Sequence, residues 1–423
     1  MSIKTKLLLG IAFGLSVSTT GYAQDAPDTG PADSNGEEII VTGIRGSLSN
    51  SAAIKRASNA IVDAISTEDL GKFPDSNVAE SLQRIPGVAI DRSSGEGRFV
   101  TVRGFGPAFN TVLLNGRTFA SDNQGREFSF DLLAAELISG AEVYKSAQAQ
   151  LQDGGIGATL NVKTPRPLEL GGFKAVLSAK AQYERNSKRT TPQLFALVSD
   201  SFADGTIGLL ASVSYQKRDS QVRFTQNRGY LPGSTLGRAP SQNSITGVIT
   251  PGDPFFYANP NSVTDPQPKF AKVFAPRNQD AGIDTQSRER LGFNATAQYQ
   301  PSDAVTFTVD GLYNKFDVGS RVESLGSWFE PSSYTAAAID GNRTVTSLTT
   351  NGVGDLIQTS NNRFVKTVAL GGNLEWKVNS NLTVKLDASW SRATDDAGGK
   401  NYFTVIGIPS SYTFQQATGK GFP

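Results

Sequence analysis

The sequence predicts a transmembrane antiparallel β-barrel preceded by a small α/β domain. Two observations predict the barrel. From residue 168 to residue 423, apolar and polar residues alternate in runs of about ten residues, and the connections between the runs are short and long in turn. A third observation predicts the domain, because residues 51–165 carry short apolar runs, helix-start residues and turn residues without this sustained alternation.

The alternating runs have the length of membrane-crossing strands. At about 3.3 Å per residue and a tilt of about 45°, roughly ten residues cross the hydrocarbon layer. In the third run the apolar set is Ile207, Leu209, Ala211, Val213 and Tyr215, and we expect such sets to face lipid. The seven expected strands are residues 173–183, 194–199, 206–216, 291–299, 305–313, 364–376 and 382–390.

Connection lengths distinguish a barrel from a soluble β-sandwich. The short connections are residues 200–205, 300–304 and 378–381, and the long ones are residues 217–288, 316–362 and the segment from 393 onward. Transmembrane barrels have short periplasmic turns and long outer loops, whereas a sandwich alternates equally well but does not predict this asymmetry. Because an eighth strand begins near the end of the sequence and so few strands leave open edges, we expect the N-terminal portion of a longer protein.

Composition excludes several classes of function. The 40 basic and 39 acidic residues give a net charge of +1, so nothing favours a nucleic-acid partner. The sequence has no Cys and no His, which removes Cys or His nucleophiles, the usual zinc ligands and axial His ligation of haem. We expect no enzyme and no cofactor. A catalytic interpretation would need a carboxylate pair such as Asp395 and Asp396, and adjacent acids in a loop are more often merely solvated.

The first 50 residues are predicted to contain an export signal and a tether. Residues 1–23 combine Lys4 and Lys6, an apolar stretch of 11 residues at 7–17, and a small-residue cleavage site at 21–23. That stretch is too short for a membrane-spanning helix, which needs about 20 residues. Residues 24–50 are expected to be a disordered tether, because their first part is rich in acids, Pro and Gly.

The tether carries a short apolar strip at residues 37–43, EEIIVTG. Its β-branched residues favour an extended backbone, which a partner could bind by adding it to a sheet edge. A chance apolar triplet in a disordered N-terminus is the alternative, and the position just ahead of the α/β domain favours the binding strip. The candidate partner-binding residues are Glu38, Ile39, Ile40, Val41, Thr42 and Gly43.

Within residues 51–165 the local signals predict a mixed domain. Asn77 and Glu80 are placed to cap a helix over 78–85, and Asn115-Gly116 is a hairpin-type turn. We expect strands at 88–90, 99–102, 110–114 and 141–145, and a second short helix at 131–138.

The strip and this domain together resemble the TonB box and plug domain of TonB-dependent outer-membrane receptors. The resemblance covers residues 51–165 through SNVAESLQRIPGV, VRGFG, LLNGR, GAEVYKS and GGIGATLNVKTPRP. It implies a 22-stranded barrel, closed by the plug, in the cell outer membrane. It also implies a TonB partner that pulls on the box with energy from the inner-membrane proton gradient, contact with outer-membrane lipid, and insertion by the barrel-assembly machinery.

The substrate is expected to be a small molecule. The plug segments resemble most the receptors of sphingomonads, caulobacters and xanthomonads, in which uptake of maltodextrins and chito-oligosaccharides is known, and this favours an oligosaccharide. A ferric siderophore or cobalamin is the alternative within the family, and a passive porin or adhesin is the alternative of another class. The polar segments 93–98 and 118–127 are expected to face outside, although turn formation and packing explain their composition equally well. The candidate substrate-binding residues are Arg98, Asp122, Asn123, Gln124 and Arg126.

Overall fold

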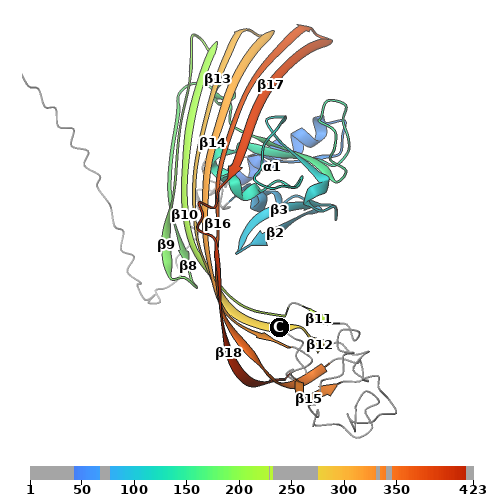
Figure 1. The fold of residues 1–423 in the computed structure, drawn as a ribbon. Helices are drawn as coiled ribbons and strands as arrows, with labels where there is room; N and C mark the ends of the chain where they lie inside the picture. The colour runs from blue at the N-terminus through green and yellow to red at the C-terminus, as the bar shows by residue number, and fades with distance from the viewer. Residues whose placement is uncertain are drawn as a thin grey trace, which may run out of the picture. The chain divides into compact units, whose positions relative to one another are not determined.

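The computed structural model describes residues 42–66, 77–227, 229–231, 275–329, 334–339 and 345–415, which belong to one compact unit. Two bodies make up this unit (Figure 1). We call the sheet of strands β8 to β10 and β13 to β18 the wall, and the elements from β1 to β7 the inner domain. The expected signal segment and residues 38–41 of the expected box lie outside the described residues.

The wall is an antiparallel sheet of nine strands. Its order is β15-β16-β14-β13-β10-β9-β8, and β17 and β18 both pair with β16. This confirms the predicted architecture, a partial β-barrel following an α/β domain. The strands are β8 Lys174–Glu184, β9 Arg189–Phe202, β10 Ile207–Gln226, β13 Asn278–Ser302, β14 Val305–Trp328, β15 Tyr334–Ile339, β16 Val345–Asn379, β17 Leu382–Asp395 and β18 Tyr402–Gln415. Two further short strands, β11 Tyr230–Leu231 and β12 Ala275–Pro276, pair with each other.

Several strands are much longer than the predicted ten residues. β10 has 20 residues and β16 has 35, so the expected long connections at 217–288 and 316–362 begin and end within strands. The strand expected near the end of the sequence is present as β18, but it does not take a new position in the wall. β17 pairs with residues 365–379 of β16 and β18 pairs with residues 347–360, so β18 continues β17 along the same neighbour.

Alternation along the wall separates two faces. Leu209 and Val309 are 50% and 63% exposed, whereas Ser212 and Thr308 on the opposite face are buried. The apolar sets therefore point away from the inner domain and the polar sets point toward it, as the sequence predicted for a barrel wall around a polar lumen. None of the helices in the described part of the chain is both long and apolar enough to cross a membrane.

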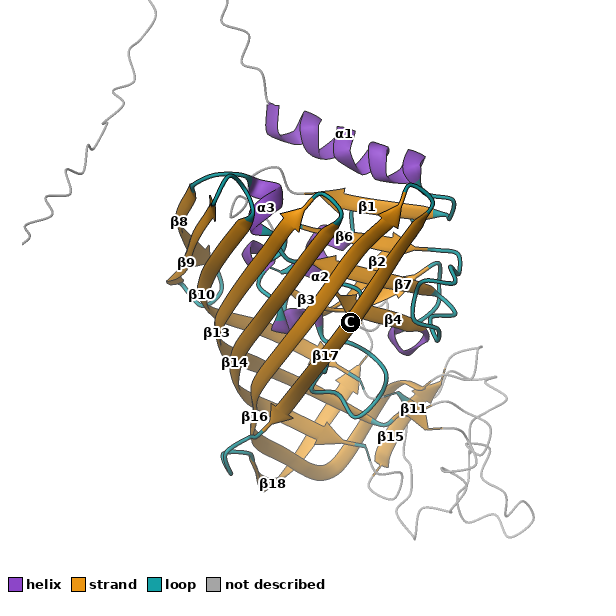
Figure 2. Cartoon of the chain, turned by 90° about the horizontal axis from the view of Figure 1, so that it is seen from above, coloured by secondary structure: helices purple, strands orange, loops and turns teal. Residues whose placement is uncertain are grey.

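The inner domain is built on a five-stranded sheet in the order β1-β6-β7-β4-β5 (Figure 2). A separate hairpin of β2 and β3 packs beside it. The strands are β1 Val62–Ser66, β2 Val88–Ser93, β3 Glu96–Val102, β4 Asn110–Leu114, β5 Arg117–Thr118, β6 Gly140–Tyr144 and β7 Ala158–Lys163. The helices are α1 Thr42–Ala57, α2 Val78–Leu82 and α3 Pro167–Leu170, and the 3-10 turns are η1 Pro107–Phe109, η2 Phe130–Leu132 and η3 Ala135–Leu137.

Local signals explain two of these elements. The Asn77 side chain accepts a hydrogen bond from the Glu80 amide at 3.2 Å, which caps α2. The carboxylate of Glu80 does not return to the cap but accepts from Arg92 at 2.6 Å. Asn115 and Gly116 have φ of 52° and 82°, as a two-residue turn between β4 and β5 requires.

Two expectations for this part of the chain were wrong. Residues 131–138 form the separate turns η2 and η3, because Leu133 and Ala134 are extended and Ala134 forms a β-bridge with Asn77. Residues 42–50, which we expected to belong to the disordered tether, form the first part of α1.

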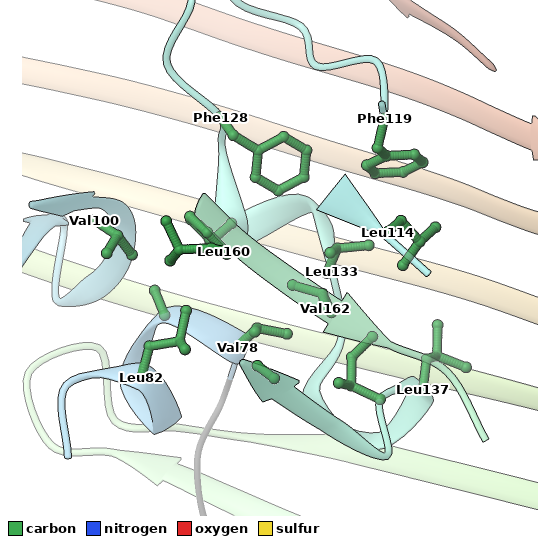
Figure 3. Packing of buried hydrophobic residues seen from close by; sticks show 14 of the residues in the cluster. Val78, Leu82, Val100, Leu114, Phe119, Phe128, Leu133, Leu137, Leu160 and Val162 are labelled. Carbon is green, nitrogen blue, oxygen red and sulfur yellow. The ribbon is translucent and has the colours of Figure 1, made fainter. Parts of the chain in front are cut away.

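A shared hydrophobic core joins the inner domain to the wall. Leu82, Leu137 and Leu160 lie at its centre, and Figure 3 shows how these side chains converge between α2, η3 and β7. The wall adds four side chains to the same cluster, Phe195, Leu197, Leu210 and Leu312. Burying such side chains stabilises by about 1.5–3 kcal/mol each, so apolar contact holds one side of the domain against the wall.

Candidate functional site: the interface between the inner domain and the wall

One carboxylate of the inner domain and two arginines of the wall form a deeply buried charged cluster at this interface. Arg288 Nη1 donates to Glu96 Oε2 at 2.6 Å, and Arg290 Nη2 donates to Glu96 Oε1 at 2.8 Å. The three side chains are only 2–6% exposed. Burial alone would raise the pKa of Glu96, but Coulombic attraction to Arg290 and Arg288, with their hydrogen bonds, holds that pKa at about 2.

The backbone brings these groups together in a simple way. Arg288 and Arg290 are two residues apart on β13, so both side chains project from the same face of the strand. Glu96 begins β3 directly after the turn at Ser94 and Gly95, whose φ values are 50° and 81°. Arg288 Nη2 also donates to the Ser93 carbonyl at 2.8 Å, and Ser94 Oγ donates to Asp284 at 3.3 Å. These hydrogen bonds hold the β2–β3 turn against β13.

A second ion-paired contact joins the η2 region of the inner domain to β16. Arg363 binds Asp131 at 2.8 Å and also donates to Asp122. Both carboxylate side chains are only 2% exposed. Burial would raise the pKa of Asp122, and the hydrogen bond from Arg363 outweighs it, so the pKa lies below its ordinary value and Asp122 is ionised at neutral pH.

The third contact has the opposite polarity, with the arginine on the inner domain. Arg117, on β5, binds Asp310 of β14 at 2.6 Å and Asp387 of β17 at 2.7 Å. Desolvation would lower the pKa of Arg117, but the hydrogen bonds to Asp387 and Asp310 raise it above its ordinary value. Close by, the Ala120 amide donates to Ser391 Oγ at 3.1 Å. These three contacts tie the inner domain to strands β13, β14, β16 and β17. A fourth ion pair, between Glu136 of η3 and Lys180 of β8 at 3.4 Å, ties it to the other side of the wall.

The expected substrate-binding residues fall into two groups. Arg98, Asp122 and Asn123 are bound to one another and to the framework: Arg98 Nη2 donates to Asn123 at 3.1 Å, and Asn123 Nδ2 donates to Ser129 at 2.7 Å. Gln124 and Arg126 are exposed, and Arg126 donates to the Gly154 carbonyl at 2.9 Å. Gln124 and Arg126 are thus the two of the five that present free surface to a ligand.

The other expectations have mixed outcomes. Thr42 and Gly43, expected to end an extended box, begin α1 instead. Asp395 and Asp396 each accept a hydrogen bond from a backbone amide. The donors are Phe364 at 3.1 Å and Gly398 at 2.8 Å, respectively. Nowhere in the described ranges do three or more His, Cys, Asp or Glu side chains gather as they would to hold a metal ion.

Sequence reasoning missed the residues that make the buried contacts. Glu96 was seen only as part of a polar turn, and Arg288, Arg290 and Arg363 were taken to border loops. The available signal was the pair of arginines two residues apart on the polar side of an alternating strand, where a barrel lumen accepts charge.

Comparison with known proteins identifies the inner domain. Residues 54–159 match the TonB-dependent Receptor Plug Domain family. The chain carries a TonB-dependent receptor plug domain. The inner domain is therefore called the plug domain from here on, and the chain is a protein of the outer membrane.

Three curated relatives, two of them named as receptors, show what the chain is similar to. The chain is 23% identical over 289 residues to the ferric enterobactin receptor of Pseudomonas aeruginosa, an alignment that covers 62% of this chain and 37% of that protein. It is 26% identical over 187 residues to the iron-regulated outer membrane virulence protein of Vibrio cholerae, covering 42% and 27%. It is 22% identical over 323 residues to the ferrienterobactin receptor of Escherichia coli, covering 71% and 42%.

The chain spans less than half the length of the curated relatives it matches. Among solved structures, the unliganded ferric citrate transporter FecA is 13% identical and superposes with a TM-score of 0.33 over 86% of this chain and 61% of FecA.

Proposed function

We propose that this chain is part of a receptor that imports a small molecule across the outer membrane with energy delivered by TonB. The observation that carries the proposal is a plug domain held against the inward face of a barrel wall by ion-paired contacts, the most extensive of them buried at Glu96 and Asp131. A plug held by apolar contact on one side, and elsewhere by ion pairs and hydrogen bonds that break one by one, could be released by a directed force and could return.

The path of the force follows from chain order. The last two residues of the proposed box, Thr42 and Gly43, begin α1, and α1 leads into β1, which is an edge strand of the plug sheet. β1 pairs only with β6, over five residues from Val62 to Ser66. Tension on the box therefore reaches an edge strand first, while the ion pairs of Glu96 and Arg117 with the wall lie further along the chain.

The partners follow from this scheme. TonB binds the box residues Glu38 to Gly43 and draws on the inner-membrane proton gradient. Lipid surrounds the exposed apolar face of the wall, and the barrel-assembly machinery inserts the complete protein. These partners are proposals that rest on the plug domain and on the apolar face of the wall.

Two substrate classes are supported by different observations. A ferric siderophore is supported by the relatives, two of which are named as receptors for ferric enterobactin or ferrienterobactin. An oligosaccharide, the substrate favoured by the sequence alone, is named by none of the relatives reported above. It rests on the exposed Gln124 and Arg126, which have the hydrogen-bonding groups that hydroxyl-rich ligands need. Arg98, Asp122 and Asn123 would then position these two residues.

Deletion of residues 37–43 from the full-length protein tests the energised mechanism. We expect ligand binding to intact cells to persist and uptake to fall to the level of a strain without TonB. A control deletion of seven residues within 24–36 leaves the box in place and should preserve uptake. A passive porin would keep importing after either deletion, and an adhesin would import in neither case, so each of these outcomes contradicts the proposal.

The substrate class requires a separate measurement. Uptake of radiolabelled ferric siderophores, oligosaccharides and cobalamin by cells with and without the receptor separates the candidates. Gln124→Ala and Arg126→Ala variants should weaken binding of the true ligand severalfold without changing the amount of folded receptor. Unchanged binding in the double variant would remove these residues from the ligand site.

A further inference from the structure

The outward face of the wall carries a row of cations that the plug contacts do not use. On four strands the first outward position beyond the apolar run is basic, whereas on β13, between β10 and β14, it is Glu289, which lies opposite Lys217. Lys217 follows Tyr215 on β10, and Lys315 follows Tyr313 on β14. Lys366 precedes Val368 on β16, which runs the other way, and Arg392 follows Trp390 on β17. The row lies on the side of the apolar run that faces the long connections, and β10, β14 and β16 continue well beyond it.

Three of these cations are close neighbours. Lys315 lies directly opposite Lys366 across the β14–β16 pair, and Val368 lies opposite Arg392 across the β16–β17 pair. Opposite side chains have Cβ atoms about 4.5–5.5 Å apart and diagonal ones about 7–8 Å, so Lys366 lies between the other two cations. Like charges directly opposite each other destabilise a sheet, and the arrangement therefore needs an explanation.

Carboxylates of the chain neutralise only part of this charge. Lys315 binds Asp317 at 2.6 Å and keeps 41% of its side chain exposed. Lys366 and Arg392 are exposed, and within the described part of the chain neither one makes an ion pair. An anion from outside the chain would relieve the repulsion.

The apolar surface next to the row shows where such an anion would come from. Trp390 and Leu370 are 54% and 56% exposed and lie opposite each other one step below the cations. A ligand that contacts both the cations and this apolar surface would have an anionic head and an apolar body. Cations and aromatic residues meet in this way at the level of lipid headgroups, where basic groups bind lipid phosphates.

We propose that Lys315, Lys366 and Arg392 form a binding site for the anionic headgroup of an outer-leaflet lipid, with a phosphate as the group recognised. The lysines donate from two strands and Arg392 presents its planar guanidinium from the third, a combination suited to the oxygens of a phosphate. The acyl chains lie along Leu370 and Trp390. The inference rests on the proposed orientation, in which the long connections face outside, and not on TonB or on the identity of the substrate.

Native mass spectrometry of the full-length receptor in detergent tests the site, with phosphorylated lipid A and its dephosphorylated counterpart as probes. We expect retained binding of the phosphorylated lipid and at least a tenfold weaker binding of the other. The double variant Lys315→Gln/Lys366→Gln should lose this preference, and Lys315→Arg/Lys366→Arg should keep it. The control Lys385→Gln removes a lysine from the inward face at the opposite end of the wall, where it binds Glu375 at 2.9 Å, and should change nothing.

Equal binding of the two lipids to the unaltered receptor would overturn the proposal, and that comparison needs no variant to fold. Full phosphate preference in the Gln double variant would overturn it as well. Because binding is measured without TonB, loss of this site and failure of energised import are distinguishable results.

Discussion

The charged residues between the plug domain and the wall hold the two together, and the contribution of each ion pair to stability depends on how deeply the pair is buried. Glu96 is 2% exposed and bound by two arginines, whereas Glu323 on the outward face is more than half exposed and bound by Arg321. Exposed pairs contribute about 0–1 kcal/mol, but removing one member of a buried pair costs about 3–5 kcal/mol, because the remaining charge is left uncompensated. The interface is therefore sensitive to single residues.

Replacement of Glu96 by Gln is expected to lower the free energy of unfolding of the plug by about 3–5 kcal/mol, because Arg288 and Arg290 lose their only shared carboxylate. Limited proteolysis of the receptor in detergent measures the opening of the plug. Glu323→Gln is the matched control and should change stability by no more than about 1 kcal/mol. Equal protease resistance of the two variants would show that Glu96 does not fasten the plug.

The same carboxylate predicts how the interface responds to acid. Its pKa falls from an ordinary 4.5 to about 2 on folding, so the folded state holds the charged form more strongly than the unfolded state does. The contribution of Glu96 to stability is complete above pH 4.5 and is lost as the pH falls from 4.5 to about 2. Denaturation midpoints measured across this range should fall steeply for the natural protein and less steeply for Glu96→Gln.

At the level of single elements, the two faces of each strand tolerate charge differently. Val309 lies on the outward face of β14, two residues beyond Phe307 and four before Tyr313, and it is 63% exposed. We expect Val309→Arg to cost about 2–4 kcal/mol, as for a cation near the middle of a bilayer. Thr285→Arg, an outward position on β13 beyond the apolar run, should cost about 0–1 kcal/mol. Refolding into lipid vesicles, followed by electrophoretic mobility with and without heating, measures both.

The sequence predicted the parts of the wall strands whose outward residues are apolar, and it missed the extensions of the strands beyond these runs. All seven alternating runs lie in strands, because an apolar outward face and a polar inward face leave a period of two. Beyond the apolar run, the outward faces of β13 and β14 become mostly polar, as at Thr285 and Arg321, so the ladder continues without the apolar period of two on that face. The expected loops were therefore too long.

The ion pairs between the plug domain and the wall could not be predicted from the sequence, and the reason is a different one. Glu96 and Arg288 are 192 residues apart, and no local rule relates a turn in one body to a strand in another. The cap at Asn77 and the turn at Asn115 were predictable, because their chemistry is complete within a few residues. The helix expected at 131–138 failed because pairing of Ala134 with Asn77, 57 residues away, overrode local propensity.

For the whole molecule, chain order separates the strand expected to detach first under tension, β1, from the residues that hold the plug domain against the wall. The chain enters the plug through α1 and β1, and β1 has one neighbour in the sheet. The ionic clamps to the wall involve residues 96, 117, 122 and 131, all later in the chain. Tension on the box is therefore expected to separate β1 from β6 before it acts on the ion pairs between the plug domain and the wall.

A disulfide across the β1–β6 pair tests this order of events. Ile65 and Ala141 lie directly opposite each other, where Cα atoms are about 4.5–5.5 Å apart, within the range that a disulfide bridges. The chain has no cysteine of its own, so Ile65→Cys/Ala141→Cys adds the only pair to it. We expect the oxidised receptor to bind its ligand normally but to lose uptake, and a reductant to restore uptake in the same cells. Each single variant should transport in both conditions. Uptake that is unchanged in the oxidised double variant would mean that β1 stays paired with β6 during import, and that tension releases the clamps to the wall instead.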